Sequence, residues 1–131
     1  MTQPLKTVLV TGATAGFGHA IALRLVKDGY RVIATGRRKE RLEALAAQAG
    51  ANLLPFVLDM TDLAALKALP ASLPTGWQQV DVLINNAGLA LGLEKAWQTN
   101  PADWERMIAT NVTGLVEITR ALLPGMVERN A

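Results

Sequence analysis

A glycine-rich turn follows the first apolar segment of the chain and reads Thr11-Gly12-Ala13-Thr14-Ala15-Gly16-Phe17-Gly18. Gly12 lets the backbone turn sharply off a strand, while Gly16 and Gly18, lacking side chains, allow a ligand and a helix to approach closely. A helix that starts here presents unpaired N–H groups and a positive dipole end, which favour a pyrophosphate. We therefore expect this turn to bind phosphate, although its Gly-x-x-x-Gly-x-Gly spacing alone also fits a plain turn.

Two arginines, Arg37 and Arg38, follow Gly36 at the end of the second apolar segment. Domains that bind NAD usually have an acidic residue in this place, which accepts hydrogen bonds from the ribose 2′-hydroxyl. Guanidinium groups suit a 2′-phosphate instead. A purely structural role explains the pair poorly, because cations are disfavoured at a helix N-terminus. The pattern predicts a dinucleotide site that prefers NADP(H) to NAD(H).

Polar residues also follow the third and fourth apolar segments. Asp59 either hydrogen-bonds the adenine amine, with the Met60 backbone alongside, or caps the short helix that comes next. Asn85-Asn86-Ala87-Gly88 follows the fourth segment, and we expect Asn86, Ala87 and Gly88 to lie beside the cofactor. Ligands of open α/β sheets bind at the carboxyl ends of the strands, so four such strand ends are more informative together than singly.

The elements that position these residues alternate between short apolar runs and helical patterns. Continuous apolar runs are typical of strands buried on both faces of a parallel sheet. The expected strands are 7–11, 31–35, 53–58 and 80–84, and the expected helices are 16–28, 39–49, 63–69 and 103–128. This alternation predicts an α/β fold: a Rossmann-like doubly wound parallel sheet with its first four strands in the order 3-2-1-4. We expect residues 1–131 to form the N-terminal part of one such domain, with the C-terminal part missing.

Local signals set the expected helix ends. Thr61 is expected to cap the third helix, and the segment Pro70–Gly76 to form a surface loop, because prolines and glycine interrupt both periodicities. The long helix is expected to begin near Asp103, whose charge suits a helix N-terminus. Pro124 and Gly125 should kink this helix or end it early.

Composition narrows the classes of protein. The chain has 131 residues, 50% of them hydrophobic, which suits one domain with a substantial core. Its formal net charge of +2 gives no indication of nucleic-acid binding. With no cysteine and a single histidine, His19, a metal site is not expected. The uncharged stretch 7–23 is too rich in glycine and threonine for a membrane span or signal peptide, so we expect no membrane association and a cytoplasmic protein.

Taken together, these motifs resemble the short-chain dehydrogenase/reductase family. The resemblance covers Thr-Gly-x-x-x-Gly-x-Gly at 11–18, Asn-Asn-Ala-Gly at 85–88 and an isolated Asn111 in the long helix. Within the family, segments 34–38, 86–94 and 122–130 resemble the NADP-dependent 3-hydroxy-acid (serine-type) dehydrogenases. Family users of NADP often carry a basic residue in the glycine turn, where this chain has Ala15, so the expected preference rests on Arg37 and Arg38.

The resemblance implies hydride transfer between NADP(H) and a small hydroxy acid or alcohol, or its carbonyl counterpart. In the family a tyrosine exchanges the alcohol proton, a lysine four residues later lowers its pKa, and a serine orients the substrate. Asn111 matches the helix asparagine whose backbone carbonyl anchors a water of the proton relay, so we expect a catalytic role for it. The family also implies a homodimer or homotetramer for the full-length protein.

No serine and Tyr-x-x-x-Lys pair matching the family pattern occurs in these residues, and we expect them to lie outside this chain. The leading hypothesis is therefore the amino-terminal segment of an NADP-dependent oxidoreductase that is inactive alone. The alternatives are a non-catalytic NADP(H)-binding sensor or interaction module, and a non-functional truncation product. In a module of just these residues, the fourth strand would be an exposed edge and the long helix would have an apolar face without a partner. Both features promote aggregation and therefore disfavour the module.

Overall fold

The computed structural model describes residues 5–89, 91 and 94–130. It contains a four-stranded parallel sheet in the order β3-β2-β1-β4, which confirms the predicted Rossmann-like architecture and strand order. The strands are β1 (Thr7–Val10), β2 (Arg31–Gly36), β3 (Leu53–Val57) and β4 (Val82–Ile84). The side chains of β1 and most of β2 are buried, as expected for strands covered on both faces.

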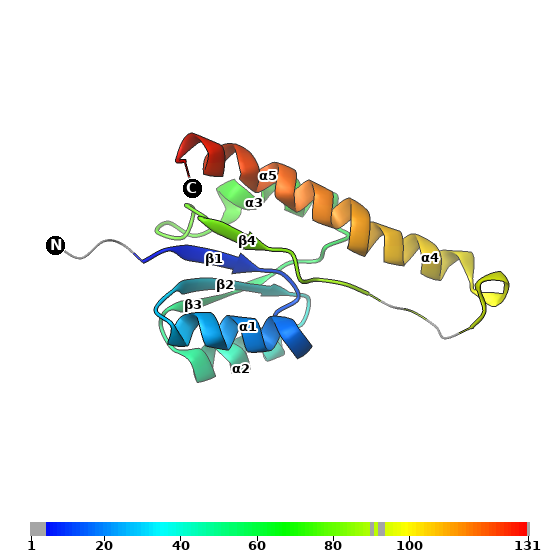
Figure 1. Cartoon of the computed structure of the whole chain (residues 1–131), viewed down its shortest axis with the longest axis horizontal. Coiled ribbons are helices and arrows are strands. Elements are labelled where there is room, and N and C mark those ends of the chain that lie inside the picture. Colours follow the sequence, from blue (N-terminus) through cyan, green and yellow to red (C-terminus); the bar gives the residue numbers. More distant parts are fainter. Residues whose placement is uncertain (1–4, 90, 92–93, 131) are drawn as a thin grey trace.

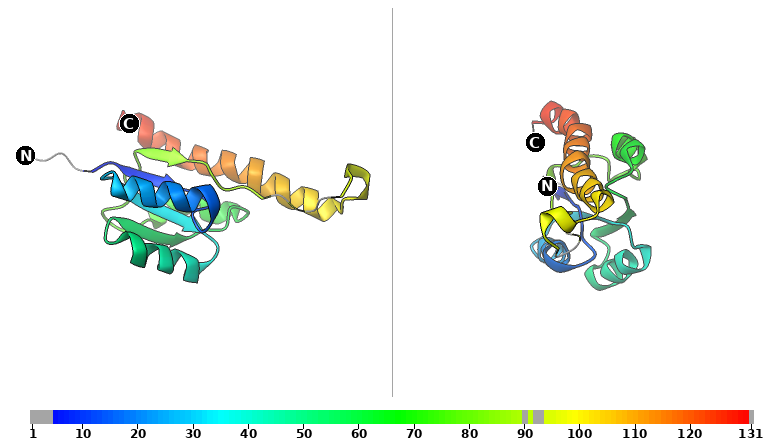
Figure 2. Two further views of the ribbon diagram at one scale, coloured as in Figure 1. Left: turned by 60° about the horizontal axis from the view of Figure 1, so that its bottom comes forward. Right: turned by 90° about the vertical axis from the view of Figure 1, so that its right-hand side faces the viewer.

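Helices cover both faces of the sheet (Figures 1 and 2). Helices α1 (Gly16–Lys27) and α2 (Lys39–Ala49) lie on one face, and their core includes Val8, Val10, Ala22, Leu42 and Leu45. Helices α3 (Leu63–Ser72) and α5 (Leu115–Glu128) lie on the other, around Leu9, Ile33, Leu66, Leu69 and Ile118. The sheet therefore separates two apolar cores, and burial of both holds the strand ends in place.

The long helical segment differs from the prediction. It begins at Pro101, two residues before Asp103, because Asn100 caps it by accepting a hydrogen bond from Ala102 N at 2.9 Å. Helix α4 (Pro101–Ile108) continues into the π-helical turn η2 (Ala109–Gly114) and then into α5. A short 3-10 turn, η1 (Ala96–Gln98), precedes it. The wide turn η2 is an irregularity of the helix that contains the predicted site residue Asn111.

The expected end of the third helix at residue 69 is wrong because tertiary burial outweighs proline. Helix α3 runs through Pro70 to Ser72, since Leu69 and Leu73 are buried and the Leu69 carbonyl accepts from Leu73 N and Ser72 Oγ. Helix α5 ends at Glu128, as the expected range 103–128 has it, and does not end early at Pro124, because its residues Ile118 and Leu122 are buried. Side-chain packing thus compensates for the hydrogen bond that each proline removes.

Two smaller expectations are also wrong. Asp62, not Thr61, caps α3 by accepting a hydrogen bond from Ala65 N at 3.1 Å, because Thr61 instead donates to Asp59. Strand β4 begins at Val82 rather than Val80, since the Asp81 carboxylate accepts the Thr7 N–H at 2.8 Å. No helix of the described ranges combines the length and apolar character needed to cross a bilayer.

Candidate functional site

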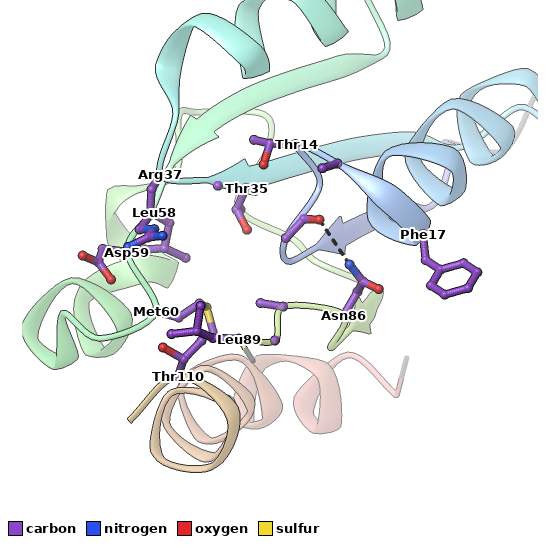
Figure 3. Close-up of a pocket in the computed structure, with 15 residues that line it drawn as sticks. Thr14, Phe17, Thr35, Arg37, Leu58, Asp59, Met60, Asn86, Leu89 and Thr110 are labelled. Carbon is purple, nitrogen blue, oxygen red and sulfur yellow. Dashed lines mark hydrogen bonds between the residues drawn. The ribbon is translucent and has the colours of Figure 1, made fainter. Parts of the chain in front are cut away.

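A cleft of ≈ 380 Å³ lies where the carboxyl ends of the strands meet (Figure 3). Each strand contributes the residues that follow its last position, so the fold alone brings together four segments that are far apart in the sequence. The cleft is lined by Gly12, Thr14, Ala15, Phe17, Thr35, Gly36, Arg37, Leu58, Asp59, Met60, Asn86, Ala87, Gly88, Leu89 and Thr110. Ten of these fifteen residues are among those predicted to bind the cofactor.

Below the cleft lies a closely packed group that we call its floor: Gly12 and Asn86, which line the cleft, and Thr11 and Gly18 beneath them. Thr11 is fully buried, and its hydroxyl accepts the N–H groups of Asn86 at 3.0 Å and Ala87 at 2.9 Å while donating to the Ile84 carbonyl. Asn86 Nδ2 donates back to the carbonyls of Thr11 at 3.2 Å and Gly12 at 3.1 Å. These bonds join the ends of β1 and β4 into one unit and satisfy the buried polar groups.

The glycine turn fits this floor only without side chains. Gly12 has a φ of +65°, and a Cβ there would lie 2.8 Å from Ala87 Cα. A Cβ on Gly18 would overlap the Gly12 carbonyl oxygen and Asn86 Nδ2. The first glycine therefore makes a turn that other residues rarely adopt, and the last lets α1 press against the end of β4.

The charged rim of the cleft lies at the ends of β2 and β3. Arg37 lines the cleft and is exposed, and Figure 3 shows it beside Asp59. Asp59 accepts hydrogen bonds from Thr61 N at 2.9 Å and Thr61 Oγ1 at 2.7 Å. These bonds hold the pKa of Asp59 below its usual value, and the positive charges of Arg37 and Arg106 lower it further, against partial burial. Asp59 therefore carries a negative charge at neutral pH.

The wall opposite β2 comes from the segment after β4 and from the helix. Asn111 Oδ1 accepts the Leu89 N–H at 2.7 Å, and Asn111 Nδ2 donates to the Leu89 carbonyl at 2.9 Å. Gly114 packs so closely against the β3–α3 loop that a Cβ would meet the Met60 carbonyl oxygen. The π-helical turn thus fixes two wall segments through Asn111 and Gly114.

Some predicted site residues lie away from the cleft surface. Ala13 is fully buried in the core on the α1 side, and Gly18 is buried beneath Asn86. Gly16 and Arg38 are exposed but do not line the cleft, and Arg38 occupies the N-cap of α2. Asn111 also lies outside the lining, where its side chain bonds to Leu89. These five surround or support the cleft rather than form its walls.

Several lining residues were not predicted. Thr35 and Leu58 belong to the strand ends themselves, and their positions next to Gly36 and Asp59 could have indicated them. Leu89 and Thr110 have no local signal, because the packing of the helix against the segment after β4 brings them together. The described residues hold no cluster of three or more His, Asp or Glu side chains arranged for a metal ion.

Comparison with known proteins agrees with this arrangement. Residues 6–131 match the family described as short chain dehydrogenase. The NADP-dependent 3-hydroxy acid dehydrogenase YdfG of Salmonella typhi is 60% identical over 123 residues, which are 94% of this chain and 50% of that protein. Serine 3-dehydrogenase of Rhizobium radiobacter is 52% identical over 94% of this chain and 49% of its own length.

The solved closed form of serine dehydrogenase complexed with NADP⁺ aligns with a TM-score of 0.90 and 56% sequence identity, covering 95% of this chain and 50% of that one. The chain thus spans about half the length of the curated relatives it matches. Since the family match covers nearly all of these residues and the glycine turn, strand order and Asn-Asn-Ala-Gly segment occur together, the chain belongs to the short-chain dehydrogenase/reductase family.

Proposed function

We propose that the cleft binds NADP(H). The observation that carries this proposal is its place in the sheet: the cleft opens at the carboxyl ends of β1 and β4, where the order of strands reverses. The cradle formed by Gly12 and Gly18 has no room for a Cβ, which suits a turn against which a pyrophosphate lies. Relatives named as NADP-dependent, and a similar structure in complex with NADP⁺, support the same ligand.

Different residues of the cleft would bind different parts of the cofactor. The turn 12–18 would hold the pyrophosphate, and Arg37 with Arg38 the 2′-phosphate, through charge-assisted hydrogen bonds. Asp59, with the Met60 backbone, would contact the adenine amine, and segment 86–88 would lie beside the rest of the cofactor. When bound, the nicotinamide ring would supply or accept the hydride.

We further propose that the full-length protein is an oxidoreductase acting on a small hydroxy acid or alcohol and its carbonyl counterpart. The names of relatives more than half identical to this chain support this reaction class. The serine and the Tyr-x-x-x-Lys pair of the family would then lie outside these 131 residues.

The catalytic role of Asn111 stays a prediction. Its side chain holds Leu89, and the π-helical turn around it is the kind of helix irregularity often found at functional sites.

Calorimetric titration of the full-length protein with NADPH and NADH tests the cofactor proposal. We expect tighter binding of NADPH, and a loss of about ten- to hundred-fold in NADPH affinity for the double variant Arg37→Ala/Arg38→Ala, because hydrogen bonds between charged groups are lost. NADH affinity should change little. Equal losses for both dinucleotides would exclude the 2′-phosphate role, and binding without turnover of any hydroxy acid would indicate a non-catalytic module.

We also propose that the full-length protein is a homo-oligomer in the cytoplasm. The outer face of the long helical segment supports association, since it exposes Trp104, Ile108, Val112, Val116, Leu123 and Val127. Light scattering of the full-length protein tests this proposal. A monomer at micromolar concentration would contradict it.

A further inference from the structure

One face of the long helical segment runs along the cleft. Residues four apart on a helix lie on the same side, and Arg106, Thr110 and Gly114 have this spacing. Thr110 lines the cleft, and Gly114 meets the loop that carries Met60. Arg106 is therefore one turn beyond Thr110 on the side that faces the cleft.

The other side of α4 supports this orientation. Trp104 and Ile108 are each two positions from Arg106, which places them about half a turn away around the helix. Both point outward, with exposed fractions of 46% and 53%. Trp104 and Ile108 thus lie on the side of α4 away from Arg106, and the exposed Arg106 lies on the side of Thr110.

Two arginines on different elements lie near enough to Asp59 for their charge to act on its carboxylate, although only Arg37 lines the cleft. Arg37 comes from the end of β2 and Arg106 from α4, and the charge of each acts on Asp59. In Figure 3, Asp59 lies beside Arg37, and Met60 and then Thr110 lie farther from Arg37. Within the described part of the chain, neither arginine forms a salt bridge with Asp59 within 4.0 Å. Arg37, which lines the cleft, is therefore not held by Asp59 in an ion pair, and Arg106 acts on Asp59 only through its charge.

A fixed negative charge on Asp59 opposes the 2′-phosphate that the neighbouring Arg37 would bind. Like charges separated by several ångströms near a protein surface repel one another appreciably. Arg37 alone supplies one positive charge for both the carboxylate and the phosphate. A second cation on the far side of the carboxylate would offset its repulsion.

We propose that Arg106 is a specificity-determining residue, which favours the 2′-phosphorylated dinucleotide by offsetting the charge of Asp59 from the helical wall of the cleft. This inference rests on the proposed binding of NADP(H). It assigns Arg106 an electrostatic role at longer range, whereas Arg37 makes the direct contact. The ligand group concerned is the adenosine 2′-phosphate, and the reacting end of the cofactor is not involved.

The test compares Arg106→Gln with Arg120→Gln in the full-length protein by calorimetry at low ionic strength. Arg120 is an exposed arginine on α5 outside this cleft and serves as the matched control. Arg106→Gln should weaken NADPH and 2′,5′-ADP by about three- to ten-fold, as expected for one partly screened charge, and NADH and 5′-AMP by less than about two-fold. Added salt should reduce the difference.

A second variant separates charge from structure. If Arg106 acts by offsetting Asp59, Arg106→Gln should weaken NADPH binding much less in an Asp59→Asn background than in the unchanged protein, whatever Asp59→Asn alone costs at the adenine. Equal NADPH affinities for Arg106→Gln and Arg120→Gln would overturn the inference while leaving the proposed function intact. Equal losses of NADPH and NADH would also overturn it. If the unchanged protein bound neither dinucleotide, both proposals would fail.

Discussion

The floor and the rim of the cleft are built on different physical principles. In the floor, Thr11, Gly12, Gly18 and Asn86 contact one another closely, and the Thr11 hydroxyl makes three hydrogen bonds. In the rim, Arg37 is an exposed side chain that forms no salt bridge in the described ranges, and Asp59 accepts hydrogen bonds from Thr61. The floor is thus part of the folded core, whereas the rim consists of charges placed at its edge.

Substitutions in the floor and in the rim should therefore have different effects on stability and on ligand binding. A substitution in the floor must disturb backbone packing, so it should affect stability and ligand binding together. A substitution in the rim changes charge in a solvated place, so it should affect the choice of ligand with little cost to folding. The following variants test that division, starting with the largest expected effect.

Gly18→Ala should be the most damaging of these substitutions. The added Cβ overlaps the Gly12 carbonyl and the Asn86 amide, and neither can move without breaking the floor. We expect a loss of about 3 kcal/mol or more in the free energy of unfolding, at the upper end for an overpacked site, measured by urea denaturation of the full-length protein.

Gly16→Ala is the matched control for this variant. Gly16 has a φ of +58°, but a Cβ there meets nothing within 4 Å. Its cost should be limited to backbone strain of about 1–2 kcal/mol. Equal losses for the two glycines would show that conformation, rather than close packing, makes the floor sensitive.

Thr11→Val should have the next largest effect. Valine keeps the shape of threonine but leaves the Ala87 N–H without its acceptor and removes one of the two acceptors of the Asn86 N–H, at a cost of about 1–3 kcal/mol. Thr61→Val provides the comparison in the rim, where the lost hydroxyl bond to Asp59 is exposed and should cost about 0.5 kcal/mol. Thermal unfolding of both variants measures the contrast, which a larger effect at Thr61 would reverse.

The same division explains what could be predicted from the sequence. The floor could be predicted because its glycine turn and its Asn-Asn-Ala-Gly segment are local patterns that come directly after apolar runs. The predicted bounds of α2 agree with the structure, since Gly50 ends that helix locally. Strand order followed from the alternation of elements, because right-handed crossovers leave few arrangements.

The walls were harder to predict because they depend on contacts between segments that are distant in the sequence. Leu89 and Thr110 line the cleft only because Asn111 binds Leu89 across 22 positions of sequence. Arg106 gives no local sign of its place near Asp59. The end of α3 was predicted too early for a related reason: burial of Leu69 by other elements decides whether that helix continues through Pro70.

Asn111→Ala tests whether the helical wall behaves like the floor. Removing the amide abolishes both bonds to Leu89, and since they are exposed we expect a loss of about 1 kcal/mol in unfolding free energy. Hydrogen exchange should become faster at the Leu89 N–H and stay unchanged at Ala87, which Thr11 holds. Asn85→Ala, which removes an exposed bond to Thr119, is the control and should leave Leu89 protected.

The pH dependence of Asp59 should produce the smallest effect. The two hydrogen bonds from Thr61 and the nearby arginines lower the pKa of Asp59 in the folded protein. Its contribution to stability is therefore fully present above the pKa of an unfolded aspartate and is lost as the pH falls through the folded pKa. The stability difference between the unchanged protein and Asp59→Ala should stay constant near neutral pH and shrink in acid.

Thr61→Val should reduce this acid-dependent part without removing it, because the backbone N–H of residue 61 still donates. Urea midpoints measured across the acid range test this, and a difference that grows as pH falls would contradict the assigned direction of the shift.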